Sequence, residues 1–163
     1  MIPFEKILVT TDFGPSSESA FAVAIELAEL HGAALTLLHV WDVPSYAYSG
    51  MEVAADDLLY PLRDRAQVHL DQALRAVQAR VPDAGCILRC GDAWKEIDEA
   101  IRETAPDLVV MGGRRGHGIA RAILGSVTEK VVRSSVVPVL TVHATTSDRA
   151  RGERGLPRPI ELV

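Results

Sequence analysis

The sequence has few aromatic residues and no excess of positive charge. Aromatic side chains make up 5% of its 163 residues, and the formal net charge is −5 at pH 7. An acidic chain lacks the basic surface with which proteins bind the phosphates of nucleic acids or anionic lipids. Its longest apolar runs also fall well short of the roughly 20 residues needed to span a bilayer. We therefore expect no nucleic-acid partner and no membrane insertion.

Cysteine is scarce as well, because the chain contains only Cys86 and Cys90. Both fall in one predicted strand, where about 3.3 Å per residue would put them roughly 13 Å apart, too far for a disulfide. Residues 1–10 carry Glu5 and Lys6 before an apolar run and lack a small-residue cleavage site, which argues against a signal peptide. Free thiols without a leader predict a cytoplasmic protein.

What the sequence does contain is a regular alternation of apolar strands and amphipathic helices. The pattern predicts strands at 5–11, 33–41, 86–90, 107–111 and 136–143, and helices at about 15–31, 53–81, 93–105 and 127–134. Crossover helices between strands require parallel pairing and cover both faces of the sheet. The fold class is therefore α/β, a three-layer α/β/α sandwich around an open five-stranded parallel sheet. Ligands bind such sheets beyond the carboxyl ends of the strands, where the winding direction reverses.

Several residues mark the predicted ends of these elements. Pro15 suits the first position of a helix, and Gly32 suits the left-handed position that follows one. Ser126 and Glu129 have the spacing of a capping box, which predicts a helix beginning near 127. Pro138, which has no amide proton to donate, favours an edge position for the last strand.

The segment from Val109 to Ser126 is the most informative part of the chain. It begins as an apolar run, contains four glycines within 112–118, and reaches Gly125 and Ser126 at a predicted helix start. Glycines let a backbone approach an anion, and amides at a helix N-terminus supply donors and partial positive charge. Arginines at 114, 115 and 121 reverse the acidic character of the whole chain. These features together predict a site for an anionic ligand.

Four segments resemble the universal stress protein (UspA-like) family. They are Ile-Leu-Val-Thr-Thr-Asp-Phe at 7–13, Leu-Leu-His-Val at 37–40, Asp-Leu-Val-Val-Met-Gly at 107–112 and Leu-Gly-Ser-Val-Thr-Glu-Lys at 124–130. The resemblance implies a domain at 1–143, with the tail at 144–163 outside it. It also implies the strand order 3-2-1-4-5 of the Rossmann-like adenine-nucleotide α-hydrolase-like fold. Members of the family commonly form homodimers, often through the last strand, here 136–143.

One branch of this family binds ATP, for which Mg²⁺ would accompany the phosphates. Its motif is Gly, two residues, Gly, nine residues, Gly, then Ser or Thr. Starting from Gly112, the second glycine is replaced by Arg115, although Gly125 and Ser126 fit. Starting from Gly113 leaves only eight residues between Gly116 and Gly125. The motif is thus broken at one position in either register.

Arg115 has two opposite interpretations. Its guanidinium could pair with a phosphate through two hydrogen bonds, or its side chain could fill the space that glycine leaves open. If that position requires a positive φ, a residue other than glycine costs about 1–2 kcal/mol.

The resemblance implies a set of nucleotide-binding residues: Thr10, Thr11, Asp12, Val40, Met111, Gly112, Arg114, Arg115, Gly116, Gly125, Ser126 and Val127. Asp12 has a second interpretation as an Asx turn before the first helix, and Ser126 has one as a helix cap only. The five histidines show no metal-ligand spacing, so no metal site is predicted among them.

Two functions remain open at this level. The first is a regulatory stress-response protein that binds ATP or another adenine nucleotide where the winding direction reverses. The second is a dimeric interaction module whose degenerate glycine loop binds no nucleotide, and an ATP-using enzyme of the wider fold group is a weaker third. No residue is placed as a general base and no Walker lysine follows the glycines. We therefore predict no catalytic residues and at most slow hydrolysis of ATP.

Overall fold

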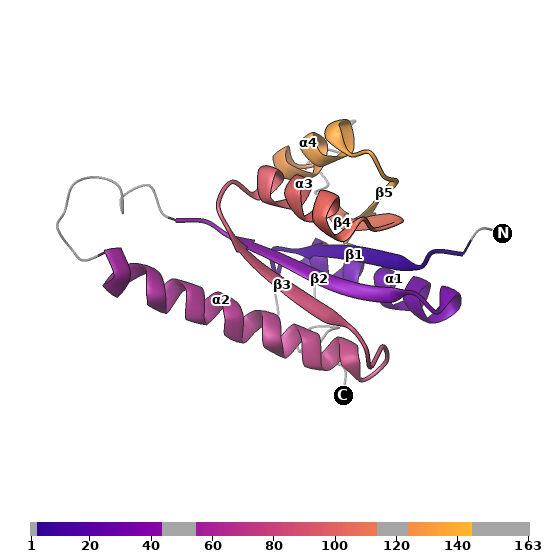
Figure 1. Ribbon diagram of the computed structural model, residues 1–163, viewed down its shortest axis with the longest axis horizontal. Helices are drawn as coiled ribbons and strands as arrows, with labels where there is room; N and C mark the ends of the chain where they lie inside the picture. The colour runs from indigo at the N-terminus through magenta and orange to yellow at the C-terminus, as the bar shows by residue number, and fades with distance from the viewer. Residues whose placement is uncertain (1–2, 44–54, 114–123, 145–163) are drawn as a thin grey trace.

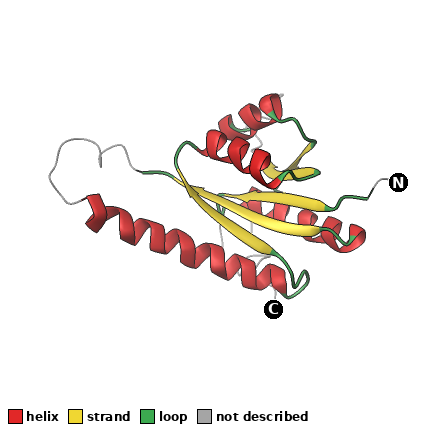
Figure 2. Ribbon diagram, in the orientation of Figure 1, coloured by secondary structure: helices red, strands yellow, loops and turns green. Residues whose placement is uncertain are grey.

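The computed structural model describes residues 3–43, 55–113 and 124–144, which contain five strands and four helices in alternation (Figures 1 and 2). The elements are β1 (Lys6–Thr11), α1 (Pro15–His31), β2 (Ala34–Trp41), α2 (Ala55–Gln78), β3 (Gly85–Cys90), α3 (Ala93–Thr104), β4 (Leu108–Gly113), α4 (Ser126–Ser134) and β5 (Val139–His143). The predictions for Arg114, Arg115 and Gly116, and for the tail beyond 144, concern residues outside these ranges.

All strand pairs in the sheet are parallel, and the strand order is β3-β2-β1-β4-β5. The predicted fold class and order are therefore confirmed. β1 is central, because it pairs with β2 on one side and β4 on the other. The chain winds from β1 towards β3 and then crosses back to β4 (Figure 1). The carboxyl ends of β1 and β4 therefore flank the point where the winding reverses.

Two helices cover each face of the sheet, and each face has its own apolar core. Ile7 and Val9 of β1 pack with α1 and α2, whereas Leu8 between them packs with α3 and α4. This alternation follows from the two-residue period of a strand. Because both faces are covered, every residue of β1 after Lys6 is buried, and none of them is charged.

Two strand ends differ from the prediction by more than one residue. β4 continues through Gly112 and Gly113, which pair with Val142 and His143 of β5. The glycine-rich segment therefore begins as extended strand, and the expected end at Met111 is two residues too early. β5 begins at Val139 and not at 136, because Pro138 offers only its carbonyl, which accepts a hydrogen bond from Val109 N at 3.0 Å.

Asp107, predicted as the first residue of β4, lies just before the strand and joins it to β1. Its Oδ2 accepts hydrogen bonds from the amides of Glu5 at 2.7 Å and Lys6 at 2.8 Å. These two bonds lower the pKa of Asp107.

The helix starts show one confirmed and one wrong prediction. α1 begins at Pro15, and Gly32 follows it with φ 66°, as expected. The capping box at the start of α4 is wrong, because Gly125 is the N-cap residue and Ser126 is already helical. Glu129 is consequently one position too far along the helix, and its carboxylate pairs with Arg133 at 2.9 Å.

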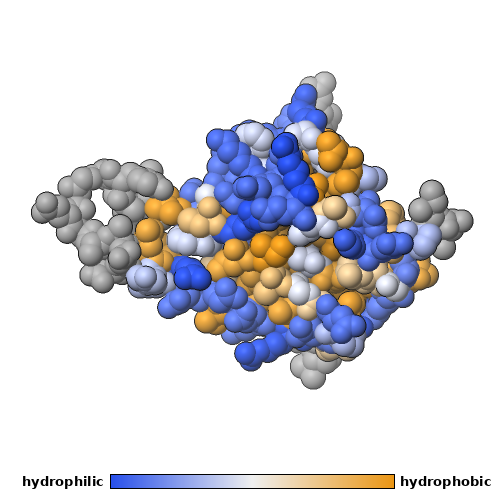
Figure 3. Space-filling model, in the orientation of Figure 1, coloured by the Kyte–Doolittle hydropathy of each residue, from blue (hydrophilic) through white to orange (hydrophobic). Residues whose placement is uncertain are grey.

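The surface view in Figure 3 shows an apolar band over β3, between the hydrophilic surfaces of α3 and α2. Arg89 of β3 covers part of this edge by pairing with carboxylates of α3, among them Glu96 at 3.4 Å. Cys86 and Cys90 in the same strand are free, as predicted, and burial raises the pKa of both thiols. Across the described ranges, no helix is both long and apolar enough to cross a membrane.

Candidate functional site

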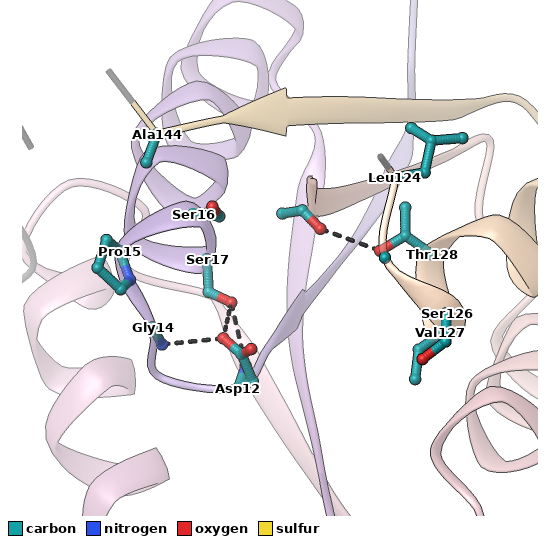
Figure 4. A pocket seen from close by; sticks show the side chains of 12 residues that line it. Asp12, Gly14, Pro15, Ser16, Ser17, Leu124, Ser126, Val127, Thr128 and Ala144 are labelled. Atoms are coloured by element: carbon teal, nitrogen blue, oxygen red, sulfur yellow. Dashed lines mark hydrogen bonds between the residues drawn. The ribbon is translucent and has the colours of Figure 1, made fainter. Parts of the chain in front are cut away.

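A cavity of about 380 Å³ lies at the carboxyl ends of β1 and β4, between the first turns of α1 and α4 (Figure 4). Its lining residues are Asp12, Gly14, Pro15, Ser16, Ser17, Gly112, Leu124, Gly125, Ser126, Val127, Thr128 and Ala144. The cavity is thus where the winding of the sheet reverses, as the topology requires for a ligand site.

Asp12 organises the α1 side of this cavity. Its Oδ1 accepts hydrogen bonds from Gly14 N at 2.9 Å and from Ser17 Oγ at 2.6 Å. The Asp12 amide in turn donates to Ser17 Oγ at 3.1 Å. The first of these bonds confirms the predicted Asx turn. Among the described residues, no hydrogen bond engages Asp12 Oδ2, which leaves that oxygen able to accept one from a ligand.

Gly112 lets α1 approach the end of β4. A Cβ at this position would lie 2.7 Å from the carbonyl carbon of Ser16 and 2.8 Å from Ser17 N. Both neighbours are backbone atoms and cannot rotate away. The wall between β4 and α1 therefore requires glycine at 112 for packing alone, whatever the cavity binds.

Thr128 fixes α4 to the same strand end. Its buried hydroxyl donates to the Gly112 carbonyl oxygen at 3.0 Å. Gly125 before the helix has φ 87°, a conformation that favours glycine. Gly112 and Thr128 thus hold the first turns of two helices against one strand end.

The first turn of α4 has backbone hydrogen-bond donors that are not used within the helix. The first bond within the helix runs from Glu129 N to the Gly125 carbonyl oxygen at 2.8 Å, and no side chain caps the helix. The amides of Ser126, Val127 and Thr128 therefore have no acceptor within the helix. Such amides attract anions, and the helix dipole adds to the attraction.

The charge of the cavity wall is mixed. α1 also begins beside the cavity without a side-chain cap, so two helix N-termini face the same space. Asp12 is the one charged side chain among the described lining residues. An anionic group would therefore be favoured near α4 and repelled near Asp12. The arrangement suits a ligand with an anionic end and a hydrogen-bond donor elsewhere.

Five predicted site residues line the cavity together: Asp12, Gly112, Gly125, Ser126 and Val127. Thr10, Thr11 and Met111 lie buried in the strands that lead to it, and Val40 packs at the end of β2 against the core under α3 and α4. The prediction omitted Gly14–Ser17, Leu124, Thr128 and Ala144. The Gly14-Pro15 helix start directly after β1 is the signal that could have identified the α1 side.

The comparisons with known proteins agree with this architecture. Residues 3–143 match the model of the Universal stress protein family. The chain belongs to this family. A universal stress protein of Thermus aquaticus is 33% identical over 141 residues, which cover 86% of this chain and 99% of that protein.

Solved structures of family members have the same fold. This universal stress protein superposes on UspA from Lactobacillus plantarum with a TM-score of 0.74 at 24% identity, covering 87% of this chain and 99% of that one. A universal stress protein solved in complex with cAMP gives a TM-score of 0.59 at 26% identity, covering 88% of this chain and 100% of that one. That relative thus binds an adenine nucleotide.

Proposed function

We propose that this universal stress protein is a stress-response regulator that binds an adenine nucleotide in the cavity between α1 and α4. The observation that carries the proposal is the uncapped first turn of α4, which faces a cavity of about 380 Å³, within the usual volume of a small-ligand site. The cAMP complex of a family member supports the choice of adenine nucleotides.

The residues present fit such a ligand. The amides of Ser126 and Val127 would donate to phosphate oxygens at the start of α4. Asp12 Oδ2 would accept from a ribose hydroxyl, since Oδ1 is occupied by Gly14 and Ser17.

A magnesium ion that accompanies ATP would depend mainly on the phosphates themselves. The part of the chain that the structure describes contains no group of three acidic, histidine or cysteine side chains placed to hold a metal ion. Mg²⁺ characteristically takes one or two carboxylates together with phosphate oxygens and water. Asp12 is the one carboxylate among the described lining residues and is assigned to the ribose, so phosphate oxygens and water would be the main ligands of Mg²⁺.

Calorimetric titrations with ATP and Mg²⁺, AMP and cAMP test the proposal. Two variants at one position separate the contributions of hydroxyl and amide. Ser126→Ala removes the hydroxyl alone, whereas Ser126→Pro also removes the amide, and proline is favoured at the first position of a helix.

Because a hydrogen bond to a charged group contributes about 1.5–3 kcal/mol, Ser126→Pro should weaken binding by about 10- to 150-fold. Thermal unfolding of both variants controls for structural damage. Absence of binding by any of the three nucleotides at millimolar concentration would refute the proposal.

Arg115 provides a second test of the same site, because it stands where the motif has glycine. If its guanidinium contacts phosphate, Arg115→Ala should weaken nucleotide binding and flatten its salt dependence. If the side chain obstructs the site, Arg115→Gly should instead strengthen binding. Equal affinity in all three proteins would show that residue 115 does not contact the ligand.

We further propose that the protein forms a homodimer through the sheet edge at 136–143. Three apolar side chains at this edge are exposed to solvent: Val132 of α4 by 40%, Val136 by 86% and Leu140 of β5 by 37%. β5 pairs with β4 on one side only within the described sheet, so its outer backbone groups can pair with a second strand.

Light scattering after size exclusion should give twice the chain mass for the wild type and a single mass for Val136→Asp with Leu140→Asp. Leu30→Asp on α1, where the leucine is 71% exposed, is the matched control and should leave the mass unchanged. A wild type that is monomeric at micromolar concentration would contradict this assignment.

A further inference from the structure

Trp94, in the first turn of α3, packs beside the start of α4. Its partly buried ring lies against the apolar core under α3 and α4, as does Val127 of the cavity wall. Two lysines lie over this ring: Lys130 of α4, with Nζ 5.5 Å from the ring centroid, and Lys95 of α3, with Nζ at 5.8 Å. An ammonium group at this distance is attracted to the face of an indole. One ring thus gathers two positive charges beside the start of α4.

Lys130 is placed to reach the uncapped first turn of α4. It follows Ser126 by four residues and Val127 by three, and residues at these spacings are neighbours on the surface of a helix. Side chains of a helix lean towards its N-terminus. The stem of Lys130 therefore extends towards the turn that carries the free amides and the positive end of the helix dipole.

The two lysines over Trp94 differ in their ion pairs. Lys95 Nζ lies 3.9 Å from Asp92 Oδ2 in the same part of the chain. Glu129, the neighbour of Lys130 in sequence, pairs instead with Arg133 at 2.9 Å. Within the described ranges no carboxylate pairs with Lys130, whose side chain is exposed. Its charge and the free amides therefore add to one another, and both attract an anion.

We propose that Lys130 binds the phosphate group of the nucleotide and that Trp94 positions its ammonium. The assignment rests on the proposed function, because the phosphate is the one that the amides of Ser126 and Val127 would hold. The ring face confines the lysine to one side of α4, while an ammonium keeps further N–H donors directed away from the ring. Backbone amides and the ammonium would thus contact the same phosphate from two directions.

Calorimetric titrations of the full chain with AMP and with inorganic pyrophosphate, each at low and high salt, test the role of Lys130. Lys130→Gln keeps the side chain long and polar and removes its charge. Loss of an exposed ion pair should weaken binding of both ligands by about 2- to 5-fold, and the affinity should fall less steeply as salt is added. Lys95→Gln is the matched control, since it removes the same charge from the same ring, and its affinities should stay close to those of the wild type. Equal affinities and equal salt dependence in the two variants would overturn the assignment.

A double-mutant cycle tests whether Trp94 acts through Lys130. Trp94→Leu should weaken binding of AMP in the wild-type background but not in Lys130→Gln. Trp94→Phe, which keeps an aromatic face, should retain part of the affinity that Trp94→Leu loses. Thermal unfolding of each variant measures any loss of packing between α3 and α4. An equal loss of affinity from Trp94→Leu in both backgrounds would show that the ring acts through packing alone, and would overturn its positioning role.

The two ligands separate this proposal from the proposed function. If pyrophosphate binds in a way that depends on Lys130 while AMP, cAMP and ATP do not bind, the phosphate site stands and the adenine nucleotide is rejected. If AMP binds equally to the wild type and to Lys130→Gln, nucleotide binding stands and the role of Lys130 is rejected. Absence of binding by pyrophosphate and by all three nucleotides at millimolar concentration would overturn both.

Discussion

Replacing Gly112 by alanine tests whether the cavity is built on a close approach of two backbones. The added Cβ would lie 2.7, 2.8 and 2.9 Å from three backbone atoms of Ser16 and Ser17, closer than real Cβ contacts. Because neither partner is a side chain that could rotate away, α1 must move from β4. The same movement would widen the wall of the cavity on its α1 side.

The magnitude follows from two opposing effects. Overpacking of a well-packed contact costs about 1–3 kcal/mol, while replacing glycine by alanine restricts the unfolded chain and stabilises the protein by about 0.4–1 kcal/mol. Gly85→Ala at the start of β3 is the matched control, because its Cβ would meet nothing within 4 Å. The control should be neutral or stabilised, and the two variants should differ by about 1–3 kcal/mol.

Urea unfolding followed by circular dichroism measures this difference, and the denaturant slopes should stay equal if only the native state changes. In a domain of this size the melting temperatures should differ by about 2–4 °C for each kcal/mol. Equal unfolding midpoints for Gly112→Ala and Gly85→Ala would refute the argument that backbone contact dictates glycine at 112. Loss of stability without loss of ligand binding would show that the ligand does not use the α1 wall.

Three further predictions concern single contacts. A Cβ at Gly113 would lie 2.6 Å from the His143 ring, which is a side chain that can move, so Gly113→Ala should destabilise less than Gly112→Ala. In urea unfolding, adding His143→Ser to Gly113→Ala should restore the lost stability. If stability is not restored, the strain does not come from the His143 ring. Asp107→Asn should lower stability more at pH 7 than at pH 2, because the two amides at the start of β1 lower the pKa of Asp107. The contribution of such a carboxylate is present above its unfolded pKa of about 3.9 and is lost as the pH falls through the folded value, so a variant effect that is equal at both pH values in urea would contradict this. Thr128→Val removes the hydrogen bond from the hydroxyl to the end of β4. It should lower the free energy of unfolding by about 0.5–1.5 kcal/mol in the same assay and should weaken nucleotide binding. Wild-type stability and affinity would show that the bond does not position α4.

Sequence patterns predicted the elements better than their ends. The inward face of α1 is fully buried, and its residues Ala20, Phe21 and Ala24 have the spacing of one helix face. The start of α4 was misplaced, because Ser126 and Glu129 match a capping box in sequence. In the structure Gly125, with φ 87°, takes the N-cap position instead. The end of β4 was misplaced because glycine is typical of loops, yet a neighbouring strand can keep Gly112 and Gly113 extended.

The candidate site was predicted in part, for a related reason. Asp12 and Ser126 both adjoin strand ends or helix starts that local patterns identify, so their presence in one region followed from the alternation of elements. The contributions of Ser17 and Thr128 did not, because each acts through a hydrogen bond to a residue brought near by the fold or the turn. A hydroxyl in a helix looks the same in sequence whether it faces water or a buried carbonyl.

By itself the sequence determined the parallel α/β class and, through the family resemblance, the strand order, and it predicted five of the residues that line the cavity. Periodicity is a local property, and it decides which face of each element becomes buried. Only the tertiary structure decided that Gly112 is needed for the approach of α1, that two uncapped helices face one cavity, and that Lys130 lies over the ring of Trp94. These are contacts between residues far apart in the chain, and their geometry exists only when the sheet and its helices have packed together.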